Sequence, residues 1–88
     1  MDRETRLKRL RFRSWHRGTR EADFMIGGFF DHASAGWNDA EIGWFEALMD
    51  EQDVDIMAWA MRRAAPPLHV EGPMMEAMRR LDYVPIAW

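Results

Sequence analysis

Apolar residues recur at helical spacing along this 88-residue chain, but only in short segments that glycine, proline or small polar residues separate. A spacing of three or four residues places side chains on one face of a helix, whereas a half-buried strand needs strict alternation, which no segment shows. The breaks limit each helix to a few turns. The pattern therefore predicts an all-α fold, a compact bundle of five short helices in a single domain.

The predicted helices cover residues 4–16, 19–32, 38–50, 54–64 and a last stretch that starts at Gly72-Pro73. Asn38 with Glu41 three positions later predicts an N-terminal capping pair for the third helix, and Asp53 is expected to cap the fourth. Pro66-Pro67 is expected to end the fourth helix, because proline cannot continue one. Pro73 suits the first turn of the fifth.

Two features of the predicted helices bear on packing. Gly27 and Gly28 are adjacent inside the second helix, which predicts either that another backbone packs closely there or that the helix has a local kink. Residues 83–88 are apolar but too short for a helix, and we expect them to pack as an extended tail or to remain loose. The whole chain, residues 1–88, is expected to form one domain, because 48% hydrophobic residues suffice for one small core.

The composition indicates the cellular compartment and excludes some classes of protein. The sequence contains no cysteine, which excludes disulfides and thiolate chemistry and fits a reducing compartment. No apolar run approaches the ~18–20 residues that span a bilayer, and the N-terminus lacks the hydrophobic middle of a secretory signal. We therefore expect a cytoplasmic protein without membrane insertion.

Charge is distributed unevenly. Residues 1–20 contain eight lysines and arginines against two acids, whereas the rest of the chain contains four arginines against thirteen acids. The first predicted helix should therefore present a cationic surface on an acidic body.

A short polar segment, Arg17-Gly18-Thr19-Arg20-Glu21, lies at the predicted break between the first two helices. Gly18 can take a positive φ or let another chain come close, Arg17 offers a planar fork of donors, and Glu21 accepts hydrogen bonds. That combination suits recognition of a partner surface. Ordinary helix capping by a glycine, with a glutamate three residues later, is the alternative explanation.

The surrounding sequence favours recognition of a partner surface over helix capping. The stretch from Arg11 to Asp23, followed by an apolar run to Asp31, resembles the small SdhE-type succinate dehydrogenase assembly factors, which an arginine-glycine-x-x-glutamate motif defines. A second block is also similar to the family: Trp44-Phe45-Glu46-Ala47-Leu48-Met49-Asp50, then Asp53-Val54-Asp55-Ile56 and Trp59. The resemblance covers about residues 5–67.

The resemblance implies a chaperone-like assembly factor. It would bind the flavoprotein subunit of succinate dehydrogenase, as well as that of the related fumarate reductase, and promote covalent attachment of FAD. The FAD belongs to the partner, and we expect this chain to hold no cofactor stably and to act as a monomer.

The motif positions of this sequence carry the implied contact. Arg17, Gly18 and Glu21 are expected at its centre: Gly18 permits close backbone approach, Arg17 makes charge-assisted bonds, and Glu21 accepts from partner donors or orients Arg17. Four neighbours are expected at its rim: Arg13, His16, Arg20 and Asp23.

Signals for catalysis or metal binding are missing from the sequence. The histidines at 16, 32 and 69 are scattered, and no catalytic motif or phosphate-binding loop is present. We therefore predict that the chain is not an enzyme and has no catalytic residues and no metal site.

Two other classes of function stay open. The basic first helix allows a small nucleic-acid-binding module acting through Lys8, Arg9, Arg11 and Arg13, although no recognition helix is evident and we expect no nucleic-acid partner. A generic protein-interaction module is the other possibility. Trp15 and Trp37, each near a predicted helix end, are expected to be part core and part contact surface.

Overall fold

The chain folds into five α-helices and one 3₁₀ turn, with no strand among residues 2–84, the part that this computed structural model describes. The all-α prediction is confirmed. The elements are α1 (Arg3–Trp15), α2 (Arg20–Ala33), η1 (Ser34–Gly36), α3 (Asp39–Leu48), α4 (Asp53–Ala60) and α5 (Pro73–Arg79).

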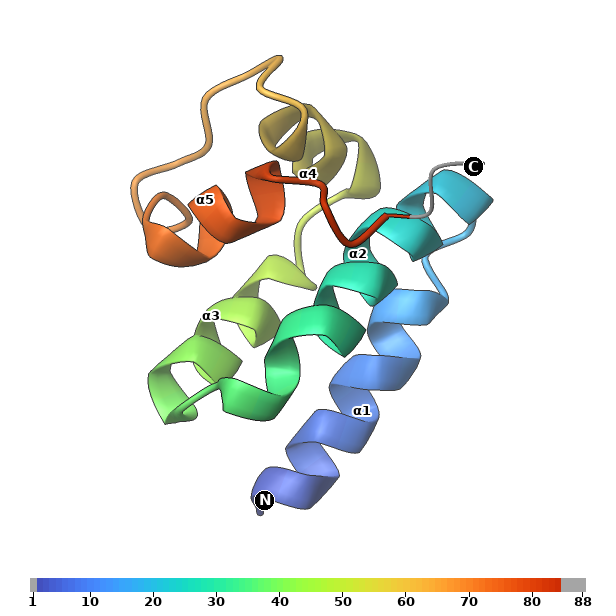
Figure 1. The fold of residues 1–88 in the computed structure, drawn as a ribbon, viewed down its shortest axis with the longest axis vertical. Coiled ribbons are helices and arrows are strands. Elements are labelled where there is room, and N and C mark those ends of the chain that lie inside the picture. Colours follow the sequence, from blue (N-terminus) through green and yellow to red (C-terminus); the bar gives the residue numbers. More distant parts are fainter. Residues whose placement is uncertain (1, 85–88) are drawn as a thin grey trace.

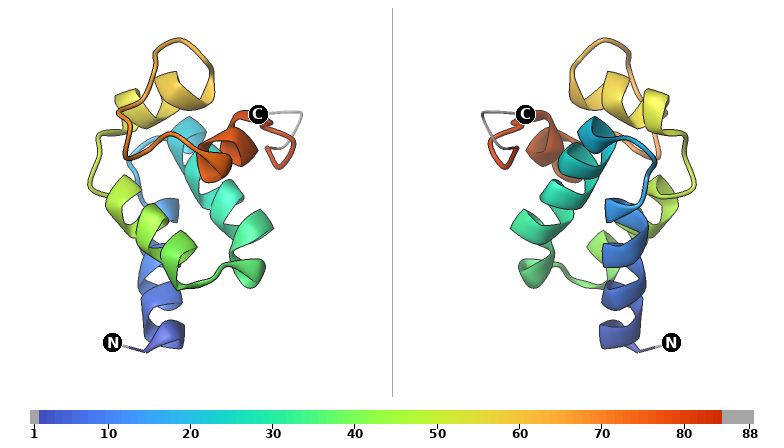
Figure 2. Two further views of the ribbon diagram at one scale, coloured as in Figure 1. Left: turned by 90° about the vertical axis from the view of Figure 1, so that its left-hand side faces the viewer. Right: turned by 90° about the vertical axis from the view of Figure 1, so that its right-hand side faces the viewer.

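Helix α2 is the centre of the arrangement. It packs along α1 and also contacts α4, while α1 in turn contacts α3. The shorter helices α4 and α5 pack together at one end of the molecule, as Figures 1 and 2 show. This topology brings the α1–α2 connection close to the turn between α3 and α4.

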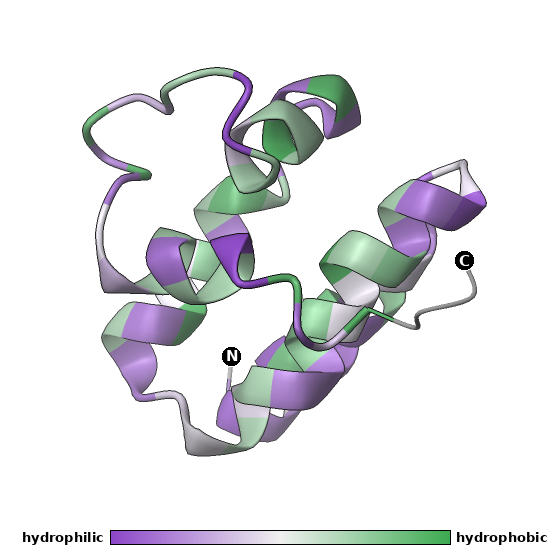
Figure 3. Cartoon of the chain, turned by 45° about the horizontal axis from the view of Figure 1, so that its top comes forward, coloured by the Kyte–Doolittle hydropathy of each residue, from purple (hydrophilic) through white to green (hydrophobic). Residues whose placement is uncertain are grey.

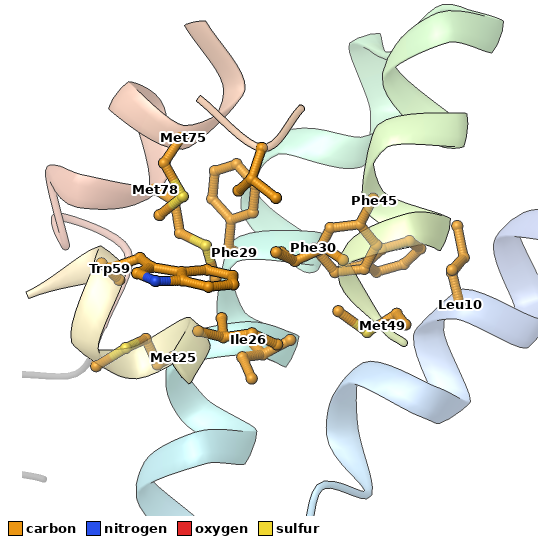
Figure 4. Close-up of a cluster of buried hydrophobic side chains, with 14 of the residues drawn as sticks. Leu10, Met25, Ile26, Phe29, Phe30, Phe45, Met49, Trp59, Met75 and Met78 are labelled. Atoms are coloured by element: carbon orange, nitrogen blue, oxygen red, sulfur yellow. The ribbon is translucent and has the colours of Figure 1, made fainter. Parts of the chain in front are cut away.

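The core is formed by apolar side chains from all five helices, some of which Figure 4 shows. Phe29 and Phe45 are fully buried, and their ring centroids lie 6.3 Å apart. Trp37 stacks against the same cluster, 5.0 Å from the Phe45 ring, and is only 5% exposed. The expectation that Trp37 is part contact surface is therefore wrong. Hydrophilic and hydrophobic residues alternate along the helices in Figure 3, as expected for helices that bury one face.

Helix ends agree with the sequence pattern at two places. Asn38 and Glu41 form a reciprocal capping box at the start of α3: the Glu41 amide donates to Asn38 Oδ1 at 2.9 Å, and the Asn38 amide donates to Glu41 Oε1 at 2.8 Å. Helix α5 begins with Pro73 in its first turn, after Gly72 at a φ of 141°. The predictions for the starts of α3 and α5 are therefore confirmed.

Helix α4 differs from its prediction at both ends. Asp53 is the first residue of the helix rather than its cap, which is Gln52, and the Asp53 carboxylate accepts from Arg17 instead. The helix ends at Ala60 rather than near residue 64, because Arg62 takes a left-handed φ of 61° before the prolines are reached.

The predicted C-terminal tail lies largely outside the described residues, which end at Val84. Tyr83 is anchored within the described part: its hydroxyl donates to the Met78 carbonyl at 3.0 Å, and its ring lies 5.4 Å from that of Phe29. Burial raises the pKa of the Tyr83 hydroxyl.

Gly27 allows close packing on α2, but the backbone that was predicted to approach there is not what packs on it. A Cβ at Gly27 would lie 2.4 Å from Cδ2 and 2.7 Å from Cγ of Trp15. A Cβ at Gly28 would only touch the Tyr83 ring, at 3.4 Å. The indole of Trp15 therefore lies directly on the backbone of α2, and the approaching group is a side chain rather than another backbone.

We expect Gly27→Ala to lower the free energy of unfolding by about 1–3 kcal/mol, because the new methyl overlaps the root of a large, rigid side chain. Urea denaturation measures the effect. The matched control is Gly28→Ala in the same helix, which should be neutral or up to about 1 kcal/mol stabilising, because alanine favours the helix over glycine. Equal stability of the two variants would contradict the packing of Trp15 on Gly27.

Candidate partner-binding site

Residues 16–21 comprise the connection between α1 and α2, residues 16–19, and the first two residues of α2; we call this segment the motif corner. Gly18 has a φ of 116°, a conformation that side-chain-bearing residues rarely adopt, and nothing lies within 4 Å of a Cβ built there. The prediction of a positive φ at Gly18 is confirmed. The corner is thus a tight turn with open space beside its glycine.

Capping does not explain the motif glutamate. The N-cap of α2 is Thr19, whose Oγ1 accepts from the Ala22 amide at 3.1 Å. Glu21 precedes Ala22 and is therefore not at the third helical position, where a capping-box acid is found. The start of α2 is therefore capped by the Thr19 side chain, and Glu21 takes no part in the cap.

The Arg17 guanidinium points inward, toward the turn between α3 and α4. Its Nε donates to Asp53 Oδ1 at 2.6 Å, its Nη1 to the Met49 carbonyl at 3.2 Å, and its Nη2 to the Glu51 carbonyl at 3.0 Å. The side chain is only 11% exposed. Arg17 therefore connects the motif corner to a segment more than thirty residues away and does not extend its fork into solvent.

Arg13 and Asp23 strengthen the same connection. Arg13 Nη2 donates to the Met49 carbonyl at 3.1 Å and to Asp50 Oδ1 at 3.0 Å. Asp23 Oδ1 accepts from the backbone amide of Arg17 at 2.7 Å. Met49 caps the C-terminal end of α3, where cations are favourable because the helix dipole is negative there. Three of the seven predicted site residues thus hold the corner in place.

The other four predicted site residues, His16, Gly18, Arg20 and Glu21, are exposed. Among the described residues, neither Arg20 nor Glu21 makes a side-chain hydrogen bond or ion pair, and Glu21 does not contact the Arg17 guanidinium. His16 stacks on the Phe12 ring with 4.0 Å between centroids, and its Nδ1 lies 2.6 Å from the Phe12 carbonyl oxygen. Within the motif, the glycine and the acid face outward, and the arginine supports them.

Two open hollows flank the motif corner. One, of about 580 Å³, is lined by Trp15, His16, Gly18, Thr19, Arg20, Asp23 and Phe24. The other, of about 500 Å³, is lined by Thr19, Glu21, Asp53, Val54, Met57, Ala58, Met61 and Arg63. Thr19 borders both, so the corner is a ridge between two depressions.

The second hollow was missed by sequence reasoning. Val54, Met57 and Met61 lie at helical spacing, which makes them available to the core, with an exposed docking groove as the alternative for the two methionines. In the structure, Val54 is 68% exposed and the two methionines are half-buried. The periodicity could not distinguish a surface groove from a core face.

The charge pattern of α1 weakens the nucleic-acid hypothesis. Arg13 is turned to α3, and Arg6 makes a two-bond ion pair with Glu46, with Nε to Oε2 at 3.1 Å and Nη2 to Oε1 at 2.7 Å. This contact lowers the pKa of Glu46. The cations of α1 therefore lie on several faces of the helix, not on one continuous basic surface.

The geometry as a whole defines a small all-α domain with an exposed corner that internal hydrogen bonds hold in place. No group of acids and histidines that could hold a metal ion is found among residues 2–84. Helices long and apolar enough to cross a membrane are likewise missing from that part of the chain.

Comparison with known proteins gives the family. A family model described as flavinator of succinate dehydrogenase matches residues 8–82. The chain belongs to this family, as its motifs predict. A protein of Acetobacter pasteurianus named FAD assembly factor SdhE is 33% identical over 73 residues, which cover 83% of this chain and 67% of that relative.

Fungal relatives are similar too. The mitochondrial succinate dehydrogenase assembly factor 2 of Mycosarcoma maydis is 37% identical over 65 residues, which cover 74% of this chain but 27% of the relative. The protein of the same name from Cryptococcus neoformans is 30% identical over 80 residues, which cover 90% of this chain and 46% of the relative. The chain thus matches half or less of these longer proteins. All three relatives are named as assembly factors and not as enzymes, in agreement with the prediction that the chain is not an enzyme.

Proposed function

We propose that this protein binds the flavoprotein subunit of succinate dehydrogenase and promotes the covalent attachment of FAD to it. Family membership supports the activity. The observation that supports the site is the exposed pair Gly18 and Glu21 on a corner that Arg17 fixes from behind. The flavin and the reactive groups belong to the partner, so this chain contributes no reacting atom and holds no cofactor of its own.

The contribution of the chain would be positioning. A corner held by Arg13, Arg17 and Asp23 does not have to become ordered on binding, so less binding free energy is lost. Gly18 lets a partner segment approach the backbone, and Glu21 accepts from the partner's N–H groups or cations. Holding partner segments so that the flavin and its acceptor residue meet in reactive geometry can contribute several kcal/mol to the rate.

Three finer points belong to the same proposal. One copy of the chain binds one flavoprotein, and the flavoprotein of fumarate reductase is a second partner. The chain acts in the cytoplasm; the fungal relatives are named as mitochondrial, and the name of the bacterial relative gives no compartment.

Glu21→Ala should weaken binding of the flavoprotein subunit about tenfold, the effect expected when a central charged contact is removed. Covalent flavin in the partner, read by in-gel flavin fluorescence in cells without another copy of the factor, should fall with it. Circular dichroism should be unchanged, because the Glu21 side chain makes no hydrogen bond or ion pair within residues 2–84.

The matched control is Asp39→Ala, which also removes an exposed acid from the first turn of a helix and so has the same effect on the helix dipole. Asp39 lies on α3, away from the corner, and we expect normal binding and flavin content. Normal flavin attachment with Glu21→Ala would contradict the site assignment.

A further inference from the structure

The outer side of α1 exposes an aromatic ring next to the motif corner. Phe12 is 64% exposed, although burial of such a side chain is favourable by about 1.5–3 kcal/mol. Within residues 2–84, only Val54 and Leu68 are large hydrophobic residues of comparable exposure. The Phe12 ring stacks nearly parallel on His16, at an interplanar angle of 17°, and the stack presents a flat surface to solvent.

An open hollow of about 470 Å³ lies beside this stack and is lined by Lys8, Arg11, Phe12, Trp15, His16 and Asp31. Trp15 and His16 also line the first hollow of the motif corner. The two hollows therefore form one continuous surface that runs from the corner along α1. Figure 2 shows α1 at the edge of the molecule.

The cations of this surface are held loosely. Lys8 Nζ lies 3.3 Å from Glu4, with both side chains at least 77% exposed, and Arg11 Nε lies 3.7 Å from Asp31, with Arg11 69% exposed. Exposed pairs of this kind contribute little to stability. Lys8 and Arg11 can therefore exchange their present partners for carboxylates of another molecule, unlike Arg6 and Arg17, which are firmly bound.

We infer that this face, formed by Lys8, Arg11, Phe12, Trp15 and His16, binds an acidic segment of the flavoprotein subunit that carries an aromatic or aliphatic side chain. The apolar side chain lies against the Phe12 and His16 stack, and flanking carboxylates pair with Lys8 and Arg11. The inference rests on the proposed function and extends the contact beyond the motif corner. Tryptophan and arginine are enriched at the centres of such interfaces.

Charge favours a protein segment over a nucleic acid as the occupant. Glu4 and Asp31 lie beside the two cations, and a phosphate backbone that runs past them would meet like charge at each. A peptide segment can place one or two carboxylates at the cations alone. The apolar stack between them also calls for an apolar side chain, which a phosphate backbone lacks.

The first test removes the ring. Phe12→Ala should weaken binding of the FAD-loaded flavoprotein subunit to the full chain about tenfold, without loss of helical circular dichroism, because Phe12 is exposed. Leu68→Ala is the matched control: it removes an exposed apolar side chain, 93% accessible, from the loop before α5, and should bind as the wild type does.

The second test reverses the charges. A variant with both Lys8→Glu and Arg11→Glu should bind the flavoprotein more than about tenfold more weakly than the wild type, and its binding should depend less on salt. Arg80→Glu, at an exposed arginine after α5, is the control and should bind normally.

The outcomes separate the inference from the proposed function. Normal binding by the Phe12 and Lys8/Arg11 variants, with loss of binding by Glu21→Ala, would overturn the inference and leave the proposed function standing. No binding of the flavoprotein by the wild type would overturn both. Labelled RNA or DNA that binds through Lys8 and Arg11, while flavoprotein binding is independent of them, would overturn the inference in favour of a nucleic-acid surface.

Discussion

Gly18→Arg should reduce binding of the flavoprotein subunit by more than about a hundredfold while the five helices still form. A new side chain at Gly18 meets open space, since nothing lies within 4 Å of its Cβ position. The same open space is where the partner backbone is expected to approach, so a long cationic side chain would keep the two surfaces apart. Covalent flavin content of the partner should fall in parallel.

The substitution has a second effect, on stability. At a φ of 116°, any residue other than glycine strains the backbone by about 1–3 kcal/mol. Gly18→Ala separates the two effects, because it carries the same strain with only a methyl group. We expect both variants to unfold at a similarly lowered urea concentration, and only the arginine variant to lose binding.

Two results would contradict this account of Gly18. Equal binding by the alanine and arginine variants would show that no partner backbone comes close at this position. Loss of helical circular dichroism in the arginine variant alone would show that the glycine matters for the fold of the corner rather than for recognition.

Arg17→Met should lower the free energy of unfolding by about 2–4 kcal/mol, which is a large part of the stability of a chain this short. The methionine keeps much of the side-chain stem but leaves the Asp53 carboxylate and the Glu51 carbonyl without the Arg17 donor, and the Met49 carbonyl with Arg13 as its remaining side-chain donor. Arg9→Met, at an exposed arginine of α1, is the matched control and should change stability by less than about 0.5 kcal/mol. Thermal and urea unfolding measure both.

A second substitution tests the cause. Adding Asp53→Asn to Arg17→Met removes the uncompensated carboxylate and should restore part of the lost stability. The Arg17→Lys variant should remain less stable than the wild type, because an ammonium cannot reach the three acceptors with the geometry of a planar fork. An Arg17→Met variant of unchanged stability that no longer binds the flavoprotein would show instead that Arg17 contacts the partner directly.

Much of the fold follows from local patterns. The helices occur where apolar residues recur at helical spacing, and Asn38 with Glu41 and Gly72 with Pro73 begin helices as their chemistry predicts. The predicted boundaries fail at α4, where the left-handed Arg62 ends the helix before the prolines. No rule of composition places a left-handed arginine there.

The position of the candidate site in the chain could be predicted from the sequence, but the arrangement of its side chains could not. The motif letters indicate the corner, and the positive φ of Gly18 follows from the properties of glycine. The same letters suggest that Arg17 and Glu21 act together at the surface, whereas the structure separates them. The hollow at Val54, Met57 and Met61 and the exposed face at Phe12 are also invisible to periodicity, because a helical stripe does not say how far a neighbouring helix extends over it.

The sequence by itself determined the presence of five helices, the Asn38–Glu41 capping box, the glycine turn between α1 and α2 and the family, because each depends on residues that are neighbours in the chain or on a motif. Only the tertiary structure decided which motif side chains are exposed and which are bound internally. Arg17 finds its acceptors 32 to 36 residues away, where the end of α3 and the start of α4 meet the corner. A guanidinium turns toward carbonyl and carboxylate groups that it can satisfy, and where those groups lie is set by the packing of the helices.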